Sequence, residues 1–90
     1  MQIKDIISVL PRIAAEKNIQ PGREISGIAY DSRRVEPGFV FFAIPGAAED
    51  GHAFAPQAVE NGALLVVAQR ELNLPADISQ IIVEDSRRAL

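Results

Sequence analysis

Two polar loops carry the residue types best suited to chemistry. The first is Tyr30-Asp31-Ser32-Arg33, which follows a candidate strand. Its serine hydroxyl can hydrogen-bond a phosphate or a base edge, and its arginine can pair with a phosphate. The same residues can also form an ordinary turn in which Asp31 bonds the local backbone. The residue types alone favour the turn over a binding loop.

The second loop runs from Gly46 to His52, again after a candidate strand and before a candidate helix. Glycines such as Gly46 and Gly51 let backbone N–H groups approach a ligand closely, and a helix N-terminus favours anions. The alternative is a plain connection capped by Asp50, with His52 as a structural residue of the first helical turn. Because both loops follow strands, they can meet in one cleft.

The sequence lacks a recognisable catalytic centre, and we expect no catalytic residue in this chain. It has one histidine and no G-x-S-x-G motif, so its serines have little to activate them. It also has no G-x-x-x-x-G-K-[ST] motif for ATP and no G-x-G-x-x-G motif for a dinucleotide. The Glu49-Asp50 pair is typical of a solvated loop. With one histidine and no cysteine, we expect no metal site.

Composition narrows the class of protein further. The chain has 90 residues, which suits one domain. A net charge of -3 argues against a nucleic-acid-binding surface. No apolar run is long enough to cross a bilayer, so we expect no membrane insertion, and the N-terminus does not resemble a signal peptide. The absence of cysteine fits a reducing compartment. We therefore expect a cytoplasmic protein.

The apolar pattern predicts which elements position these loops. Helical spacing predicts a helix over 3–10, ended by Pro11. The stretch 12–18 stays undecided, with a further helical turn as one reading. A second helix is expected over 52–61, and a last one from residue 87, capped by Asp85-Ser86. Strands are expected over 25–30, 39–44, 64–68 and 81–83.

This order of elements predicts the α/β class, with a small mixed sheet of about four strands flanked by helices. Five side chains are expected to be buried in its core: Phe41, Ile44, Val59, Val66 and Ile82. The chain stops a few residues into its last predicted helix. We therefore expect it to be a piece of a longer polypeptide.

A longer pattern connects the two loops and resembles a known family. Its parts, in order, are Asp31-Ser32-Arg33, Val35-x-Pro37-Gly38, Phe41-Phe42-Ala43-Ile44-Pro45-Gly46, Asp50-Gly51-His52-x-Phe54 and Gln57-Ala58-Val59-x-x-Gly62-Ala63. Each part is common, but their order and spacing resemble the N-terminal domain of the Mur ligases. The opening from Ile25 to Arg33 is most similar to the MurE type, and the MurF type is the close alternative.

The resemblance implies a role in peptidoglycan synthesis, cell wall biogenesis and thus cell shape and division. MurE-type ligases add the third amino acid to UDP-N-acetylmuramoyl-L-alanyl-D-glutamate. Residues 1–90 would be the domain that binds the UDP part of this substrate. ATP and Mg²⁺ would serve the parent enzyme, whose central and C-terminal domains would be partners of this one. This chain alone would need no cofactor and would be inactive.

The resemblance also implies roles for single residues. Tyr30 and Ser32 match uridine-diphosphate contacts in the first loop, and Ala47, Ala48 and Glu49 match contacts in the second. Loop-shaping roles are expected for the other motif residues: Asp31, Arg33, Gly46, Asp50, Gly51 and His52. A free-standing, non-catalytic module that binds a nucleotide sugar or a protein remains the other reading of the chain.

Overall fold

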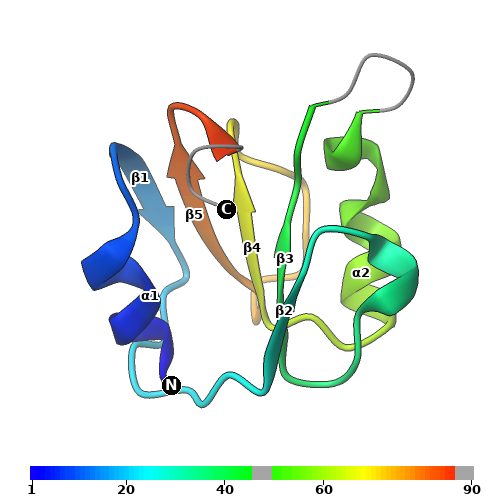
Figure 1. Cartoon of the computed structure of the whole chain (residues 1–90), viewed down its shortest axis with the longest axis horizontal. Helices are drawn as coiled ribbons and strands as arrows, with labels where there is room; N and C mark the ends of the chain where they lie inside the picture. Colours follow the sequence, from blue (N-terminus) through cyan, green and yellow to red (C-terminus); the bar gives the residue numbers. More distant parts are fainter. Residues whose placement is uncertain (46–49, 87–90) are drawn as a thin grey trace.

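The computed structural model describes residues 1–45 and 50–86 of the chain. Two short α-helices, two 3-10 turns and five strands follow one another within these residues (Figure 1). In chain order they are α1 (Ile3–Val9), β1 (Ile13–Lys17), β2 (Gly27–Ala29), η1 (Ser32–Arg34), β3 (Phe39–Phe42), η2 (Gly51–Phe54), α2 (Ala55–Glu60), β4 (Leu65–Ala68) and β5 (Ser79–Val83).

The strands form one mixed sheet in the order β1-β5-β4-β3-β2. Strands β2, β3, β4 and β5 pair in parallel, whereas β1 runs antiparallel to β5 at one edge. Val40 pairs with Leu65 and Val66 with Gln80, which aligns the central strands. The predicted α/β class and mixed sheet are confirmed, with one strand more than the four expected from the sequence.

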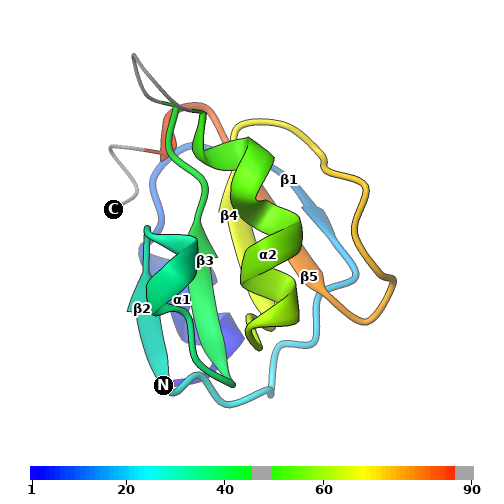
Figure 2. The same ribbon diagram turned by 90° about the vertical axis from the view of Figure 1, so that its right-hand side faces the viewer.

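Alternating side chains give the sheet two apolar faces. Val40 and Leu65 pack on one face with Ile3 and Ile6 of α1. The other face includes Phe41 and packs against α2 through Ala55 and Ala58. Figure 2 shows α2 in front of the sheet and α1 behind it. Covering both faces explains why the central strands read as continuous apolar runs.

The stretch 12–18, which the sequence left undecided, contains strand β1. Residues 12–18 form no helical turn; their central part pairs with β5. Arg12 and Asn18 flank the strand, both with φ of 54°. The middle residues, Ala14, Ala15 and Glu16, are exposed and give no apolar signal. Pairing with β5, a contact distant in sequence, therefore decides this element.

Other predictions need smaller corrections. The strand predicted over 25–30 is β2 and covers only Gly27–Ala29, and β3 ends at Phe42. Strand β5 begins earlier, at Ser79. The second helix begins as a 3-10 turn at Gly51. Phe41 and Val66 are buried as predicted, but Ile44, Val59 and Ile82 are only partly buried, because each lies near or beyond the end of its element. The last predicted helix lies beyond the described residues.

Candidate functional site

The four parallel strands end on the same side of the sheet, the upper side in Figure 1. We call this row of strand ends the carboxyl edge. Tyr30 follows β2, Pro45 lies beyond the end of β3, and Gln69 follows β4. Open α/β sheets bind ligands at this edge, because loops from neighbouring strands converge there. The first loop and the described residues that flank the second, Pro45 and Asp50, lie at this edge, as their positions after strands predict.

Asp31 organises the first loop. Its Oδ1 accepts hydrogen bonds from the Arg33 backbone N–H and Nε, each at 3.0 Å, and its Oδ2 accepts from Arg33 Nη2 at 2.9 Å. The Arg33 side chain, and next its backbone N–H, lower the pKa of Asp31 to about 2. The carboxylate thus caps η1 and holds the Arg33 guanidinium against the loop.

Ser32 faces the protein rather than solvent. Its hydroxyl, in a residue only 5% exposed, donates to Oε1 of Gln57 at 3.1 Å. Its carbonyl oxygen accepts from Nδ2 of Asn61 at 2.9 Å. Ser32 therefore attaches the first loop to α2. Its contact with uridine diphosphate stays a prediction, and donating to a ligand would require the bond to Gln57 to break.

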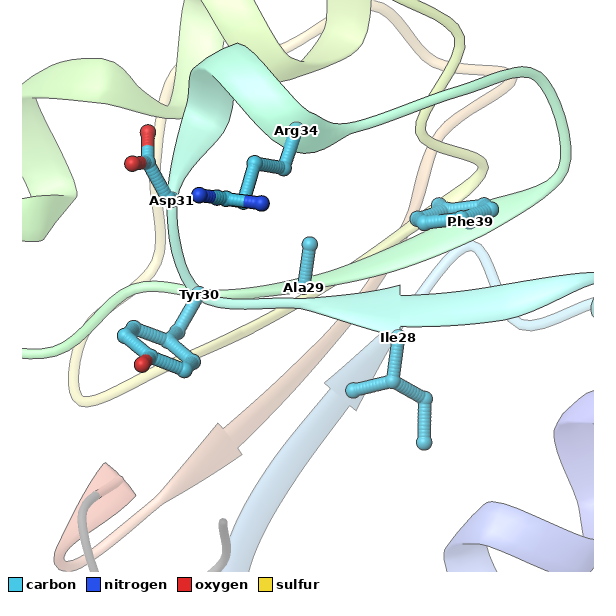
Figure 3. Close-up of a pocket in the computed structure, with 6 residues that line it drawn as sticks. All are labelled: Ile28, Ala29, Tyr30, Asp31, Arg34 and Phe39. Atoms are coloured by element: carbon cyan, nitrogen blue, oxygen red, sulfur yellow. The ribbon is translucent and has the colours of Figure 1, made fainter.

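Tyr30 lies at an open pocket of about 450 Å³ at the end of β2 (Figure 3). Tyr30 is 65% exposed. In Figure 3, Tyr30 and Ile28 lie on one side of β2, whereas Ala29 and Arg34 lie on the other, with the Arg34 guanidinium near Asp31. The end of β2 thus presents an aromatic surface on one side and a cation on the other.

The second loop is closed at its base. The Gly51 N–H donates to the Ile44 carbonyl oxygen at 2.9 Å, and we call this pair the neck. A Cβ on Gly51 would lie 2.6 Å from both N and O of Ile44, so the neck requires glycine. The predicted site residues between them, Gly46, Ala47, Ala48 and Glu49, lie outside the described residues.

Asp50 and His52 continue from the neck into the fold. Asp50 Oδ1 accepts from the His52 backbone N–H at 3.0 Å and lies 2.7 Å from Nδ1 of the ring. These two contacts with His52, the backbone one first, lower the pKa of Asp50. Nε2 of His52 accepts from the Gln69 backbone N–H at 2.9 Å. Since Nε2 accepts, Nδ1 carries the ring proton and donates it to Asp50.

Gln69 is a member of this group that the sequence did not reveal. It looks like the first polar residue of a long connection, yet its Oε1 accepts from the backbone N–H and the hydroxyl of Ser86, at 3.0 and 3.2 Å. The only signal in the sequence is its place directly after a buried strand. Its partners are 17 residues away on either side, a spacing that no local pattern predicts.

Residues 1–45 and 50–86 contain neither a candidate metal site nor a membrane-spanning helix. No group of three or more histidine, cysteine or acidic side chains could hold a metal ion there. Within the same described part of the chain, no helix has the length and apolar character needed to cross a membrane.

Comparison with known proteins gives a consistent family signal. The profile described as "Mur ligase family, catalytic domain" matches residues 24–89. A UDP-N-acetylmuramoyl-L-alanyl-D-glutamate--2,6-diaminopimelate ligase from Syntrophomonas wolfei is 54% identical over 68 residues, 76% of this chain and 14% of the relative. The enzyme of the same name from Geobacillus thermodenitrificans is 40% identical over all 90 residues, 18% of its own length.

Solved structures agree on the fold. A crystal structure of MurF from Acinetobacter baumannii matches 98% of this chain and 19% of its own, with a TM-score of 0.83 and 28% identity. The predicted resemblance to a Mur ligase fold is therefore confirmed. The chain spans less than a fifth of the length of each of these proteins.

Proposed function

The chain belongs to the Mur ligase family, and from this premise we propose that it holds the UDP part of the substrate of a peptidoglycan-precursor ligase. The substrate would be UDP-N-acetylmuramoyl-L-alanyl-D-glutamate, the compound in the names of its relatives. The observation that supports the proposal is that the family match agrees with the position of the first loop and of the neck at the carboxyl edge of the parallel strands.

Tyr30 is the proposed contact for the uracil ring. Its exposed phenol offers a flat apolar surface, and stacking of a base on an aromatic side chain typically contributes about 1–3 kcal/mol. Arg34 lines the same pocket and would attract the diphosphate. Ser32 and the backbone of Ala47, Ala48 and Glu49 are the further proposed contacts. Asp31 and Arg33 would act indirectly, by holding the first loop in shape.

The proposed ligase is of the MurE type. Two relatives, at 54% and 40% identity, are named as diaminopimelate ligases. The MurF structure from Acinetobacter baumannii, at 28% identity, supports the alternative, a MurF-type ligase. Assays of the whole protein with UDP-linked dipeptide or tripeptide acceptors distinguish the two, since each type extends only one of them.

In this proposal ATP and Mg²⁺ bind to other domains of a longer ligase, because the 90 residues hold no P-loop motif. ATP would supply the energy for forming the new peptide bond. In this proposal the chain binds and orients the nucleotide end of the substrate, in the cytoplasm, and does not itself contact the reacting atoms.

Chemical-shift mapping of the labelled chain with UDP tests the proposal directly. We expect perturbed amides at Tyr30 to Arg34 and at Asp50 to His52. The site is open, so the dissociation constant should lie between roughly 10 µM and 1 mM, or about 4 to 7 kcal/mol of binding energy. Perturbations confined to residues 72–79 would contradict the placement of the site.

Two variants sharpen this test. Tyr30→Ala should weaken UDP binding by at least about five-fold with little change in stability, because the ring is mostly exposed. Ile28→Ala is the matched control: Ile28 is 49% exposed and lies on the same side of β2. Equal losses from both variants would argue against stacking on Tyr30.

A further inference from the structure

A chain of hydrogen bonds crosses the carboxyl edge of the sheet from β3 to β5. It starts at Asp50, passes through both ring nitrogens of His52 to the backbone of Gln69, and continues from the Gln69 side chain to Ser86. Asp50 and His52 follow β3, Gln69 follows β4, and Ser86 lies three residues beyond β5. Three neighbouring strand ends are therefore connected by polar contacts.

Two members of this hydrogen-bond network, His52 and Ser86, are buried. The His52 side chain is 1% exposed and Ser86 is fully buried. Buried polar groups need partners, and a fully satisfied network holds its members in one arrangement. Apolar side chains would fill this space equally well but would not fix the orientation of a ring or a backbone N–H. The network thus fixes the relative positions of the segments that follow β3, β4 and β5.

Gln69 is the centre of this network. Its backbone N–H fixes the tautomer and orientation of His52, whose own backbone and ring hold Asp50 beside the neck at Gly51. Its Oε1 accepts two hydrogen bonds from Ser86.

We propose that Gln69 is a positioning residue for the substrate site: it holds the neck of the second loop at a fixed place relative to the end of β5. This inference rests on the proposed function, because the proposed contacts for the nucleotide sugar follow strands at the same carboxyl edge as the neck. Gln69 itself touches no substrate in this proposal. It acts through His52 on one side and through Ser86 on the other.

Gln80 provides a matched control. It is a second glutamine, 1% exposed, whose side chain also makes two hydrogen bonds, to the backbone N and O of Leu72 at 2.9 and 3.0 Å. It lies near the start of β5, away from the carboxyl edge. Gln80→Leu therefore removes as many hydrogen bonds as Gln69→Leu, but far from the neck.

The test measures UDP affinity and stability of the chain with three variants. Gln69→Leu should weaken UDP binding by about 3- to 10-fold, since it leaves two buried donors of Ser86 unpaired. Gln69→Glu should restore affinity to within about two-fold, because a carboxylate also accepts from both donors. Gln80→Leu should lower stability while UDP affinity stays within about two-fold. Equal losses of affinity in Gln69→Leu and Gln80→Leu would overturn the proposal.

A second measurement keeps the two proposals separable. The chain has one histidine, so ¹⁵N spectra report the His52 ring without ambiguity. Gln69→Leu should shift the His52 ring and Gly51 amide signals, and Gln80→Leu should leave them unchanged. If the wild-type chain binds no UDP, the proposed function is wrong, and the His52 and Gly51 signals alone test whether Gln69 positions the neck. Unchanged signals in Gln69→Leu would contradict the positioning role.

Should Gln69→Leu fail to fold, Ser86→Ala replaces it. That change removes only the bond between the Ser86 hydroxyl and Gln69 and leaves the backbone bond in place. It should give a smaller change in the same direction, in both the UDP affinity and the Gly51 signal. A folded Ser86→Ala chain with wild-type values for both would contradict the proposal.

Discussion

At the scale of single residues, the carboxylates of the two loops are already engaged by their own neighbours. Asp31 accepts three hydrogen bonds from Arg33, and Asp50 accepts from His52 and lies 3.5 Å from Arg70. Such carboxylates shape backbone and are poorly placed to act as general bases.

Asp31 should make the stability of the chain depend on pH at acidic values. Its pKa is lowered to about 2 in the folded chain, below the roughly 3.9 of an unfolded aspartate. Its stabilising effect is therefore complete above about pH 4 and is lost as the pH falls toward 2. Asp31→Asn should remove this part of the dependence, so its urea midpoint should approach that of the wild type near pH 2.

Arg33→Gln removes the same pair from the opposite side and serves as the companion variant. It should flatten the same part of the pH profile, because Arg33 is the main cause of the lowered pKa. Wild-type and Asp31→Asn curves that run parallel from pH 6 to pH 2 would show that the pair does not contribute.

Sequence reasoning found some of these residues and missed others for a physical reason. Asp31, Asp50 and His52 were recognisable because their partners lie two residues away, within one turn. The partner of Ser32 is Gln57, on a different element, so the serine looked available for a ligand. Contacts of this kind depend on how the elements pack, which the sequence alone does not specify.

At the scale of elements, predictability followed the depth of burial. The central strands β3 and β4 were predicted because they are buried on both faces and therefore almost wholly apolar. The edge strand β1 was missed because the exposed residues in its middle show no pattern. Its existence depends on the free edge of β5. Long-range pairing can thus override weak local preference.

The neck of the second loop should not tolerate a side chain on Gly51. Gly51→Ala would bring a Cβ to 2.6 Å from two backbone atoms of Ile44, which cannot move without disturbing β3. We expect a loss of about 1–3 kcal/mol in the free energy of unfolding, measured with urea.

Gly22→Ala is the control for this change. A Cβ on Gly22 would meet nothing within 4 Å, and its φ lies outside the left-handed region. The substitution should be neutral or stabilising by up to about 1 kcal/mol, because alanine restricts the unfolded chain. Equal stability of the two variants would mean that the neck opens at little cost.

At the scale of the whole molecule, stability depends on two thin cores separated by one sheet. Val66 is fully buried within the core beneath α2. Val66→Asp would place an unpaired charge there and should cost several kcal/mol, a large share of the roughly 5–15 kcal/mol typical of native domains. The amide spectrum should lose its dispersion, and thermal unfolding should lose its cooperativity.

The same change at the surface separates charge from burial. Val9 ends α1 and is 69% exposed. Val9→Asp should therefore cost no more than about 1 kcal/mol, mainly from a negative charge at a helix C-terminus. A soluble, cooperatively folded Val66→Asp chain would refute the assignment of β4 to the core.

If other domains of a longer ligase bind ATP, this chain should not bind Mg-ATP. Calorimetric titration with Mg-ATP should give no measurable heat of binding at concentrations where UDP binds, because the sequence has no P-loop. UDP in the same buffer is the positive control. Micromolar affinity for Mg-ATP would contradict the assignment of ATP to other domains of a longer ligase.

The neck has a further consequence for how such a protein can evolve. Ile44 and Gly51 are joined by one backbone hydrogen bond, and Asp50 and His52 are anchored by bonds of their own. We therefore expect that residues 46–49 can be exchanged without redesign of the scaffold, provided that Ile44, Pro45, Asp50 and Gly51 are kept. Selection can then alter recognition while foldability is preserved, and a library randomised at residues 46–49 would sample new specificities on an unchanged frame.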